Sequence, residues 1–543
     1  MQAIESTATP FDPGAVALDA SLDQAWHPKF NPWLIGSAVS LAAFMEVLDT
    51  SIANVALPYM AGSLGASNDE STWVLTSYLV SNAIVLPISG WLANVIGRKR
   101  FFMTCIFLFT ASSLFCGIAP SLPLLLLARI VQGAGGGGLQ PMAQAILADT
   151  FPPEQRGLAF ALYGITAVTA PTIGPTLGGW ITDNYSWRWI FFINLPVGLM
   201  ALGLVLRLVE DPPQLMRKAS RMRLDYIGIA LLVLGIGALQ ILLDKGQEDD
   251  WFGSHYITGL AVVAAVCLVG LVIWEWFYEE PIIEVRLFKN FNFLSANLMM
   301  FAFGVMLFSS LVMMPLFLQT LTGYTAELAG LAISAGGLVI LAEMPFVGQL
   351  TQRVQVRYII AAGWLALTIG MFYSARNINL LISFGFATWM RIVQVLGIGL
   401  LFVPITLAAY IGMPQEKSGT VAGMINFMRN IGASVGTSMV ATLIARRAQF
   451  HQVHLVAQLS PENPLFEDRV KALGAHLSAA GLGRYQGQQQ AYARISQAMQ
   501  HQAQTLAYID TFWTLAAIAL VMFVLSFILK KNDPGAGGEM AVG

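Results

Sequence analysis

Charged residues are scarce in this chain of 543 residues, where they make up 11% of the sequence, against roughly a quarter in soluble domains. Hydrophobic residues make up 56% and recur in long runs. This is too few charged side chains for the water-exposed surface of a soluble protein of this size. The sequence therefore predicts an all-α protein that crosses a membrane many times. A transmembrane β-barrel is excluded because the runs are continuously apolar rather than alternating.

Cysteine, metal-binding patterns and enzyme motifs are also rare or missing. Cys105, Cys116 and Cys267 all fall inside apolar runs, which predicts no disulfide framework. His451 and His454 have no acidic or cysteine companions nearby, so we expect no metal and no cofactor. The sequence has no GxxxxGK[ST], HExxH or GxSxG motif, and its net charge of -2 indicates no nucleic-acid partner. The missing ATP-binding motif makes an ion gradient the expected energy source of any transport. The missing catalytic motifs make a membrane-embedded enzyme a weaker alternative, and a channel is a second one.

What the sequence does contain is a series of apolar runs long enough to cross a bilayer. Each span needs roughly 20 residues, because a helix rises about 1.5 Å per residue and the hydrocarbon core is about 30 Å thick. The sequence predicts fourteen such helices. They are 34–58, 72–94, 101–119, 122–147, 158–182, 189–208, 226–243, 256–278, 294–318, 327–350, 358–375, 382–411, 418–446 and 508–530.

The short loops between these spans differ in basic residues. With the N-terminus inside, seventeen lysines and arginines fall on the cytoplasmic side and three, Arg188, Lys245 and Arg376, on the outer side. Because positive residues mark cytoplasmic loops, we expect both termini in the cytoplasm. One outer connection, 447–507, is long and partly of helix-forming composition, which predicts a folded or helical extension outside the membrane. A solvated loop without a partner is the alternative.

An internal repeat divides the chain into two halves. The tetrapeptide RIVQ occurs at 129–132 and again at 391–394, and the same offset of 262 residues places Gly174 on Gly436. Two parallel six-helix bundles with two helices inserted between them account for the fourteen spans. The predicted order is a cytoplasmic tail (1–33), the first bundle (34–208), the two inserted helices with their loops (209–293), the second bundle (294–530, including the outer loop 447–507) and a second tail (531–543).

Four stretches resemble motifs of one transporter family. They are GWLANVIGRKR from Gly90, LDTSIANVALP from Leu48, RIVQGAG from Arg129 and APTIGPTLGG from Ala170. The first is similar to the motif of the loop between spans 2 and 3, and the others are similar to the motifs of spans 1, 4 and 5 in drug:proton antiporters. With fourteen spans and the long outer loop, the chain resembles the EmrB-type branch of the drug:proton antiporter-2 family, in the major facilitator superfamily.

This resemblance implies the major facilitator fold and proton-coupled export of hydrophobic drugs or toxic compounds by alternating access, in a bacterial inner membrane. It also implies a periplasmic membrane-fusion adaptor and an outer-membrane channel as partners of the outer loop. A narrow-substrate exporter or importer that acts alone is the alternative. The motif residues expected to serve the conformational change are Gly90, Gly97, Arg98, Gly174, Pro175 and Gly178.

Charged side chains inside spans cost at least about 2.5 kcal/mol on insertion scales, so each one is a candidate functional residue. Glu46 and Asp49 are three residues apart and share one side of the first span. The resemblance places spans 1 and 4 side by side, so Arg129 is their expected partner. Burial favours a neutral acid and a nearby cation favours a carboxylate. We predict Asp49 as the proton carrier and Glu46 as a second acid; a purely structural ion pair is the alternative.

The second half offers fewer charged candidates. Glu343 is an isolated acid within a span, and we predict that it takes part in proton coupling or contacts substrate, or else is hydrogen-bonded between helices. Arg391 corresponds to Arg129 in the repeat, yet the ninth span has no acid to match Asp49, so Arg391 is either structural or a site for an anionic group. The predicted substrate-binding residues, polar anchors and adaptable apolar side chains, are Gln132, Met306, Met313, Phe317, Arg391 and Gln394.

Overall fold

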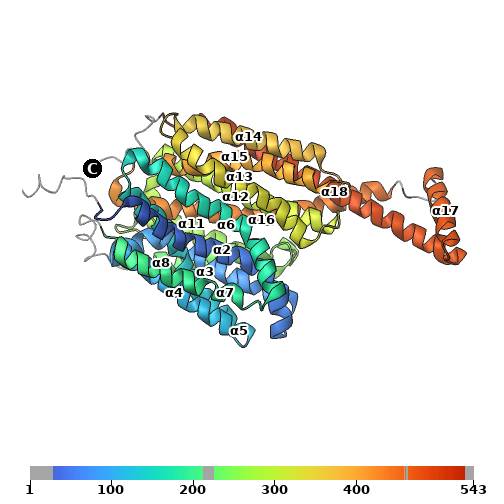
Figure 1. Ribbon diagram of the computed structural model, residues 1–543, viewed down its shortest axis with the longest axis horizontal. Coiled ribbons are helices and arrows are strands. Elements are labelled where there is room, and N and C mark those ends of the chain that lie inside the picture. Colours follow the sequence, from blue (N-terminus) through green and yellow to red (C-terminus); the bar gives the residue numbers. More distant parts are fainter. Residues whose placement is uncertain (1–27, 212–224, 458, 460–462, 532–543) are drawn as a thin grey trace, which may run out of the picture.

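The computed structural model describes residues 28–211, 225–457, 459 and 463–531, and each regular element in these ranges is a helix (Figure 1). Nearly all of the predicted tails, 1–33 and 531–543, lie outside the described residues. The longer helices before the inserted pair are α2 (Pro32–Leu64), α3 (Asn68–Ile96), α4 (Arg98–Ile118), α5 (Leu122–Thr150), α6 (Arg156–Asn184) and α8 (Asn194–Leu208), with the short α7 (Trp189–Phe192) before α8.

The remaining helices are the inserted pair and the second half. The pair is α10 (Tyr226–Lys245) and α11 (His255–Phe277). The second half contains α12 (Phe291–Thr320), α13 (Ala326–Leu350), α14 (Val356–Asn377), α15 (Phe384–Tyr410), α16 (Ser418–Val456), α17 (Pro464–Ala479) and α18 (Arg484–Ser526). Short 3-10 turns lie at Pro153–Gln155, Trp251–Gly253, Val285–Lys289 and Gln415–Lys417.

Every predicted span overlaps one of these helices, except that the sixth is divided between α7 and α8. Within the described residues, thirteen segments are long and apolar enough to cross a membrane, with α7 and α8 together forming one of them. The predicted span 418–446 is not among them, because α16 carries Asn426, Arg429, Asn430 and several hydroxyl side chains. The all-helical fold is confirmed, while the count of fourteen spans stays a prediction.

Helix contacts define two bundles and the places where they meet. Helix α2 packs on α6, and α5 packs on α3 and α4, whereas α15 packs on α14 and α13, and α16 on α12. The bundles meet where α6 contacts α13 and where α3 contacts α16. Helix α10 lies against α3 and α16, and α11 packs mainly on α10, so most of its apolar surface is exposed.

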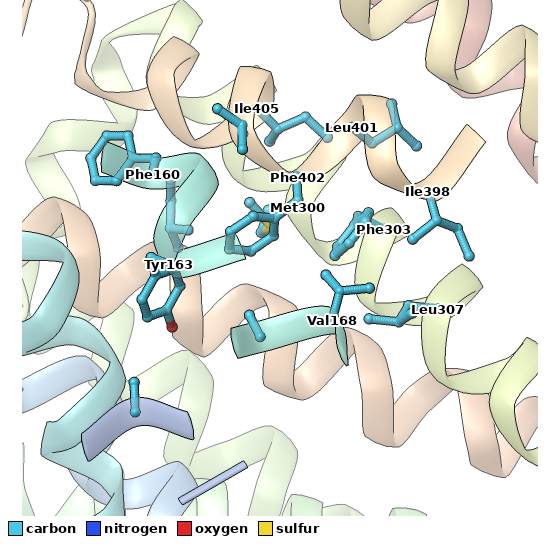
Figure 2. Close-up of a cluster of buried hydrophobic side chains, with 14 of the residues drawn as sticks. Phe160, Tyr163, Val168, Met300, Phe303, Leu307, Ile398, Leu401, Phe402 and Ile405 are labelled. Atoms are coloured by element: carbon cyan, nitrogen blue, oxygen red, sulfur yellow. The ribbon is translucent and has the colours of Figure 1, made fainter. Parts of the chain in front are cut away.

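An apolar cluster joins α6 of the first bundle to α12 and α15 of the second (Figure 2). The Tyr163 ring of α6 stacks on Phe402 of α15 with 5.8 Å between ring centroids, and Phe160 stacks on Tyr410 at 5.5 Å. Such aromatic pairs add roughly 0.5–1.5 kcal/mol beyond the area that they bury. The hydroxyl of Tyr163 points away from this cluster, toward the first bundle (Figure 2).

The long predicted outer loop is helical in the described residues. The end of α16, all of α17 and the beginning of α18 project from one end of the bundle (Figure 1). Val470 and Leu477 of α17 and Ala491 of α18 are buried against one another and form a small separate core. Asp510 of α18 accepts a hydrogen bond from Arg447 Nε (2.6 Å) and contacts His451 Nε2 (2.7 Å). The helical structure is confirmed, and its place outside the membrane stays a prediction.

Candidate functional site

Asp49 and Arg129 form a buried ion pair between α2 and α5. The Asp49 Oδ2 to Arg129 Nη1 distance is 2.6 Å, and the two residues are 2% and 0% exposed. Gln132 and Asn194 each donate a hydrogen bond to Asp49 Oδ1, at 3.0 and 2.6 Å. A buried charge is tolerated only with a charged or hydrogen-bonding partner, and here both oxygens of the carboxylate have one. The sequence prediction that Arg129 faces Asp49 agrees with this geometry.

The surrounding helices hold this ion pair in place. Arg129 Nε donates to the backbone oxygen of Val74 on α3 at 3.1 Å, and its Nη1 also donates to Gln132 Oε1 at 2.7 Å. Asn194 reaches the site because it is the first residue of α8, directly after the break between α7 and α8. Gln132, predicted as a substrate anchor, is completely buried and bonds Asp49 and Arg129. Its contact with substrate therefore stays a prediction.

Glu46 forms a second buried cluster one turn before Asp49 on α2. Its Oε1 accepts hydrogen bonds from Tyr78 Oη (2.9 Å) and Asn82 Nδ2 (3.1 Å), and its Oε2 accepts one from Gln140 Nε2 (2.5 Å). Three donors are therefore directed at this one buried carboxyl group. The Arg129 guanidinium lies over the Tyr78 ring, 4.3 Å from its centroid. This cation–π contact joins the Glu46 cluster to the Asp49 cluster.

Polar contacts continue from the Glu46 cluster into the second bundle. Gln140 Oε1 accepts hydrogen bonds from Tyr163 Oη (3.0 Å) and from Arg429 Nη2 of α16. Asn430, the next residue of α16, donates to Asn82 Oδ1 at 3.0 Å. Two of the three direct partners of Glu46, Gln140 and Asn82, are therefore bonded to α16.

The predicted counterpart in the second half has a different partner set. Arg391 is 1% exposed, and its Nη1 donates to Ser310 Oγ (3.0 Å) and Gln394 Oε1 (3.3 Å). Gln394 in turn donates to Ser374 Oγ at 2.8 Å. Among the described residues, no carboxylate forms an ion pair with Arg391. Arg391 thus shares with Arg129 the hydrogen bond to the glutamine three residues later, while a serine hydroxyl takes the place of the acid.

The other predicted acid and apolar residues lie apart from these clusters. Glu343 is half-buried beside Gly399 of α15, and within the described part of the chain its buried Oε2 has no hydrogen-bond partner. Met306, Met313 and Phe317 are completely buried in the core, where Phe317 packs edge-on against Tyr508 at 5.1 Å. The structure therefore does not bring these four residues to the Asp49 site, and their roles stay predictions.

The Gly90 motif lies where α3 approaches α16. A Cβ atom at Gly90 would lie 2.6 Å from the backbone nitrogen of Thr420, so only glycine permits this approach. Gly97 ends α3 with a positive φ of 95°, which favours glycine. Arg98 forms a buried ion pair with Asp149 at the end of α5, and Ser418 Oγ donates to Asp149 at 3.0 Å. Asp149 is a partner that the sequence analysis did not identify.

The span 5 motif brings α6 close to α2. At Gly178 a Cβ would lie 3.1 Å from the backbone oxygen of Ile52, and at Gly174 it would collide with the Ser51 side chain. Pro175 has no N–H to offer the carbonyl of Pro171, four residues earlier. Ser51 Oγ donates to that carbonyl at 3.0 Å, so a side chain of α2 takes the place of the missing donor. Helix α6 remains continuous through both prolines.

Several residues of these clusters were not singled out from the sequence. They are Tyr78, Asn82, Gln140, Asn194 and Asn430, together with Arg429, a charged residue within the predicted span 418–446. Each is a polar residue within a largely apolar helix, and this is the only feature of the sequence that could have marked it as a site residue. Because polar residues are common at helix–helix contacts in membranes, that signal does not say which of them meet.

Comparisons with known proteins agree with this architecture. The sequence model of the Major Facilitator Superfamily matches residues 39–437. The multidrug export protein EmrB of Escherichia coli K12 is 36% identical over 501 residues, 92% of this chain and 96% of EmrB. EmrB of Haemophilus influenzae is 40% identical over 432 residues, 80% of this chain and 84% of that protein.

A solved structure shows the same fold at low sequence identity. The proton:xylose symporter XylE, bound to 6-bromo-6-deoxy-D-glucose, has a TM-score of 0.56 and 13% identity, and the alignment covers 92% of this chain and 96% of XylE. At that identity the likeness concerns the fold alone. The family match and the extensive identity to the two EmrB proteins go further: this chain belongs to the major facilitator superfamily, among the EmrB-type multidrug transporters.

Proposed function

We propose that this protein exports hydrophobic drugs or toxic compounds across a bacterial inner membrane in exchange for protons. The observation that carries the proposal is the buried ion pair of Asp49 and Arg129 within a major facilitator fold. An acid that faces a buried cation can exist as a carboxylate at bilayer depth, and it can also take up a proton when the pair separates. The names of the two EmrB relatives support multidrug export as the transport activity.

The proposed cycle uses Asp49 as the proton carrier. With Asp49 ionised, Arg129 and the donors Gln132 and Asn194 hold the carboxylate in place. A proton from the outer side converts the carboxylate to a carboxylic acid, which removes the attraction to Arg129 and favours a rearrangement of α2 against α5. Release of that proton to the cytoplasm restores the ion pair. Glu46 and Glu343 are the further acids proposed to take part in coupling.

The proton gradient supplies enough free energy for useful export. One proton that moves down a potential of 100 mV releases about 2.3 kcal/mol. At balance this corresponds to a roughly fiftyfold gradient of a neutral substrate. The predicted substrate contacts Met306, Met313, Phe317, Arg391 and Gln394 lie in the second bundle and, with Gln132, stay part of this proposal.

We further propose that both termini lie in the cytoplasm and that α17 and the beginning of α18 lie in the periplasm. There they would meet a membrane-fusion adaptor, which leads to an outer-membrane channel. The projection of these helices from the bundle supports this placement (Figure 1). Photo-crosslinkers on the exposed side chains of Leu465 and Tyr485 should capture the adaptor in cells. A transporter that acts alone would give no adduct while the same variants still export drug.

Reconstitution into liposomes tests the coupling site directly. With a pH gradient imposed, a lipophilic drug should cause proton release in the wild type and none in Asp49→Asn, which retains the shape of Asp49 but cannot carry a proton. Glu343→Gln tests the second bundle's proposed acid in the same assay, because Glu343 lies apart from the Asp49 cluster, and a loss of flux in it would add Glu343 to the coupling path. Equal proton flux in the wild type and Asp49→Asn would place coupling elsewhere. No flux in any variant, with drugs that are transported, would contradict proton antiport.

A further inference from the structure

The inserted helix α10 bonds to both bundles near the end of the molecule where α3 begins and α10 ends. On the first bundle, Thr76 of α3 donates a hydrogen bond to the carboxylate of Asp244. Lys245 Nζ donates to Thr72 Oγ1, also on α3. Lys245 is 6% exposed, and its Nζ pairs with Glu248 at 2.6 Å as well. Charged groups of α10 therefore make its polar contacts with α3.

The polar contacts of the inserted pair with the second bundle are neutral. Gln240 of α10 is 1% exposed and exchanges two hydrogen bonds with Ser434 Oγ of α16, at 2.8 and 3.1 Å. About two turns further along α16, Thr442 Oγ1 accepts a hydrogen bond from the indole Nε1 of Trp251 at 3.1 Å. Trp251 lies in the turn between α10 and α11. Because charge-assisted hydrogen bonds are roughly twice as strong as neutral ones, the contacts with α16 are the weaker set.

The backbone around Trp251 is strained. Asp250 and Trp251 have φ angles of 58° and 47°, and among the described residues they are the only ones other than glycine with a positive φ. Bulky L-residues rarely adopt this left-handed conformation. The turn is held because the Trp251 amide donates to the Gly246 carbonyl at 2.7 Å, and the indole packs so closely on Gly246 that a Cβ there would lie 2.8 Å from the ring. The bond to Thr442 is a further contact, and it comes from the other bundle.

The bond between Trp251 and Thr442 can form and break at low cost. The Thr442 hydroxyl donates to the backbone oxygen of Ser438 at 2.9 Å, so its lone pairs are available to the indole N–H. The same Nε1 lies 3.2 Å from Gln247 Oε1, on the turn itself. When α16 moves away, the indole N–H therefore keeps an acceptor, and no buried donor is left unpaired.

We propose that Trp251 is a positioning residue of the transport cycle, whose bond to Thr442 holds the outer ends of the two bundles together and breaks when they separate. This inference rests on the proposed function, because it assumes alternating access and places this end of the molecule on the outer side. The inserted pair stays with the first bundle through Asp244 and Lys245, while its neutral contacts with α16 are released. The pair thus acts as a strap between the bundles.

Distances between spin labels test which contacts break. Labels at Leu124 of α5 and at Leu381, in the loop before α15, report the separation of the outer ends, because both side chains are exposed, at 52% and 93%. A label at Tyr256 of α11, which is 51% exposed, reports the position of the inserted pair. The labelled protein carries Cys267→Ala, because that cysteine is only partly buried.

The proposal fixes how these distances change in nanodiscs. By pulsed electron resonance, the distance between positions 124 and 381 should take two values in the wild type, one for closed and one for separated outer ends. The distance between positions 256 and 381 should change with it. The distance between positions 256 and 124 should stay constant, because the inserted pair moves with the first bundle.

Variants on both sides of the contact measure its contribution. Thr442→Val keeps the shape of threonine and removes the acceptor, so it should raise the ratio of separated to closed outer ends about fivefold, the effect of one neutral hydrogen bond. Trp251→Phe keeps an aromatic ring without the donor and should give the same shift, and the double variant should give no further shift. Thr442→Ser keeps the hydroxyl and should keep the wild-type ratio.

Gln247→Leu is the matched control. It removes the other acceptor of the same indole N–H and leaves the contact with α16 in place, so the ratio should not change. Equal shifts in Gln247→Leu and Thr442→Val would show that only the stability of the turn matters, and the inference would be wrong.

Other outcomes would also overturn the inference. If Thr442→Val is folded and monodisperse in detergent yet keeps the wild-type ratio, Trp251 does not hold the outer ends together. If Thr442→Val does not fold, the same comparison is decided by Trp251→Phe. A constant distance between positions 256 and 381 would mean that the inserted pair moves with the second bundle. The proposed function fails on a separate result, a wild type that transports drug in liposomes without moving protons, whatever the distances show.

Discussion

The two halves of the molecule carry the same buried arginine and glutamine but surround them differently. Arg129 and Gln132 lie 262 positions before Arg391 and Gln394. In the first half the arginine faces the carboxylate of Asp49 at 2.6 Å; in the second half it faces the hydroxyl of Ser310 at 3.0 Å. The repeated pair therefore supplies a common framework for helix packing. Among the described residues, an acid that pairs with this arginine is present in the first half alone.

The same contrast continues one and two turns further along α5 and α15. Gly136 and Gln140 of α5 correspond to Ile398 and Phe402 of α15. Gly136 leaves space for the Glu46 cluster, since a Cβ there would lie 2.5 Å from Tyr78 Oη. Ile398 and Phe402 instead belong to the apolar cluster between the bundles (Figure 2). At equivalent depth, one helix borders a polar network and the other an apolar core.

Removal of Arg129, the arginine of the first half, should have the largest effect on stability. Arg129→Met leaves the buried Asp49 without its cation, and we expect a loss of about 3–5 kcal/mol in the free energy of unfolding. Titration with SDS in mixed micelles would measure it. The double variant Arg129→Met/Asp49→Leu is the control, because it removes both charges and should recover most of the loss. A double variant as unstable as the single one would mean that packing, rather than the unpaired acid, causes the effect.

A side chain at Gly136 tests the contrast between polar and apolar surroundings. Gly136→Ile copies the residue that stands at the equivalent position of α15, but in α5 it would displace Tyr78 and Asn82 from Glu46. We expect a loss of about 1–3 kcal/mol from overpacking, together with reduced drug-driven proton flux in liposomes. Gly62→Ala is a suitable control, because a Cβ at Gly62 meets no atom within 4 Å. Unchanged stability and flux in Gly136→Ile would contradict the importance of this close packing.

Removal of Arg391, the arginine of the second half, should have the smallest effect on stability. Arg391→Met removes a buried charge that has no carboxylate partner among the described residues, so the relief of its burial offsets the lost hydrogen bonds to Ser310 and Gln394. The free energy of unfolding should change by about 1 kcal/mol or less in the same SDS titration. A loss as large as that of Arg129→Met would show that Arg391 has an acidic partner in another conformation, and the contrast between the halves would be wrong.

Local sequence patterns were sufficient for the helices and for part of the site. Apolar runs of spanning length placed the helices because each run must satisfy its backbone hydrogen bonds internally within a bilayer. The RIVQ repeat related the halves, and two acids three residues apart on one span pointed to Asp49 and Glu46. Met306, Met313 and Phe317 could not be assigned in this way, because a buried core position and a substrate-facing one favour the same residue types.

By itself, the sequence of this protein determined its membrane class and its two related halves, because long apolar runs leave few physical choices. The expected pairing of Asp49 with Arg129 came from the family resemblance, which places their two spans side by side. Only the tertiary structure decided that Asn194, Tyr78 and Gln140 complete the two acid clusters, and that Arg429 reaches them from the other half. These contacts join residues up to 289 positions apart. Which polar side chains meet depends on how helices rotate and pack, and no local pattern specifies that.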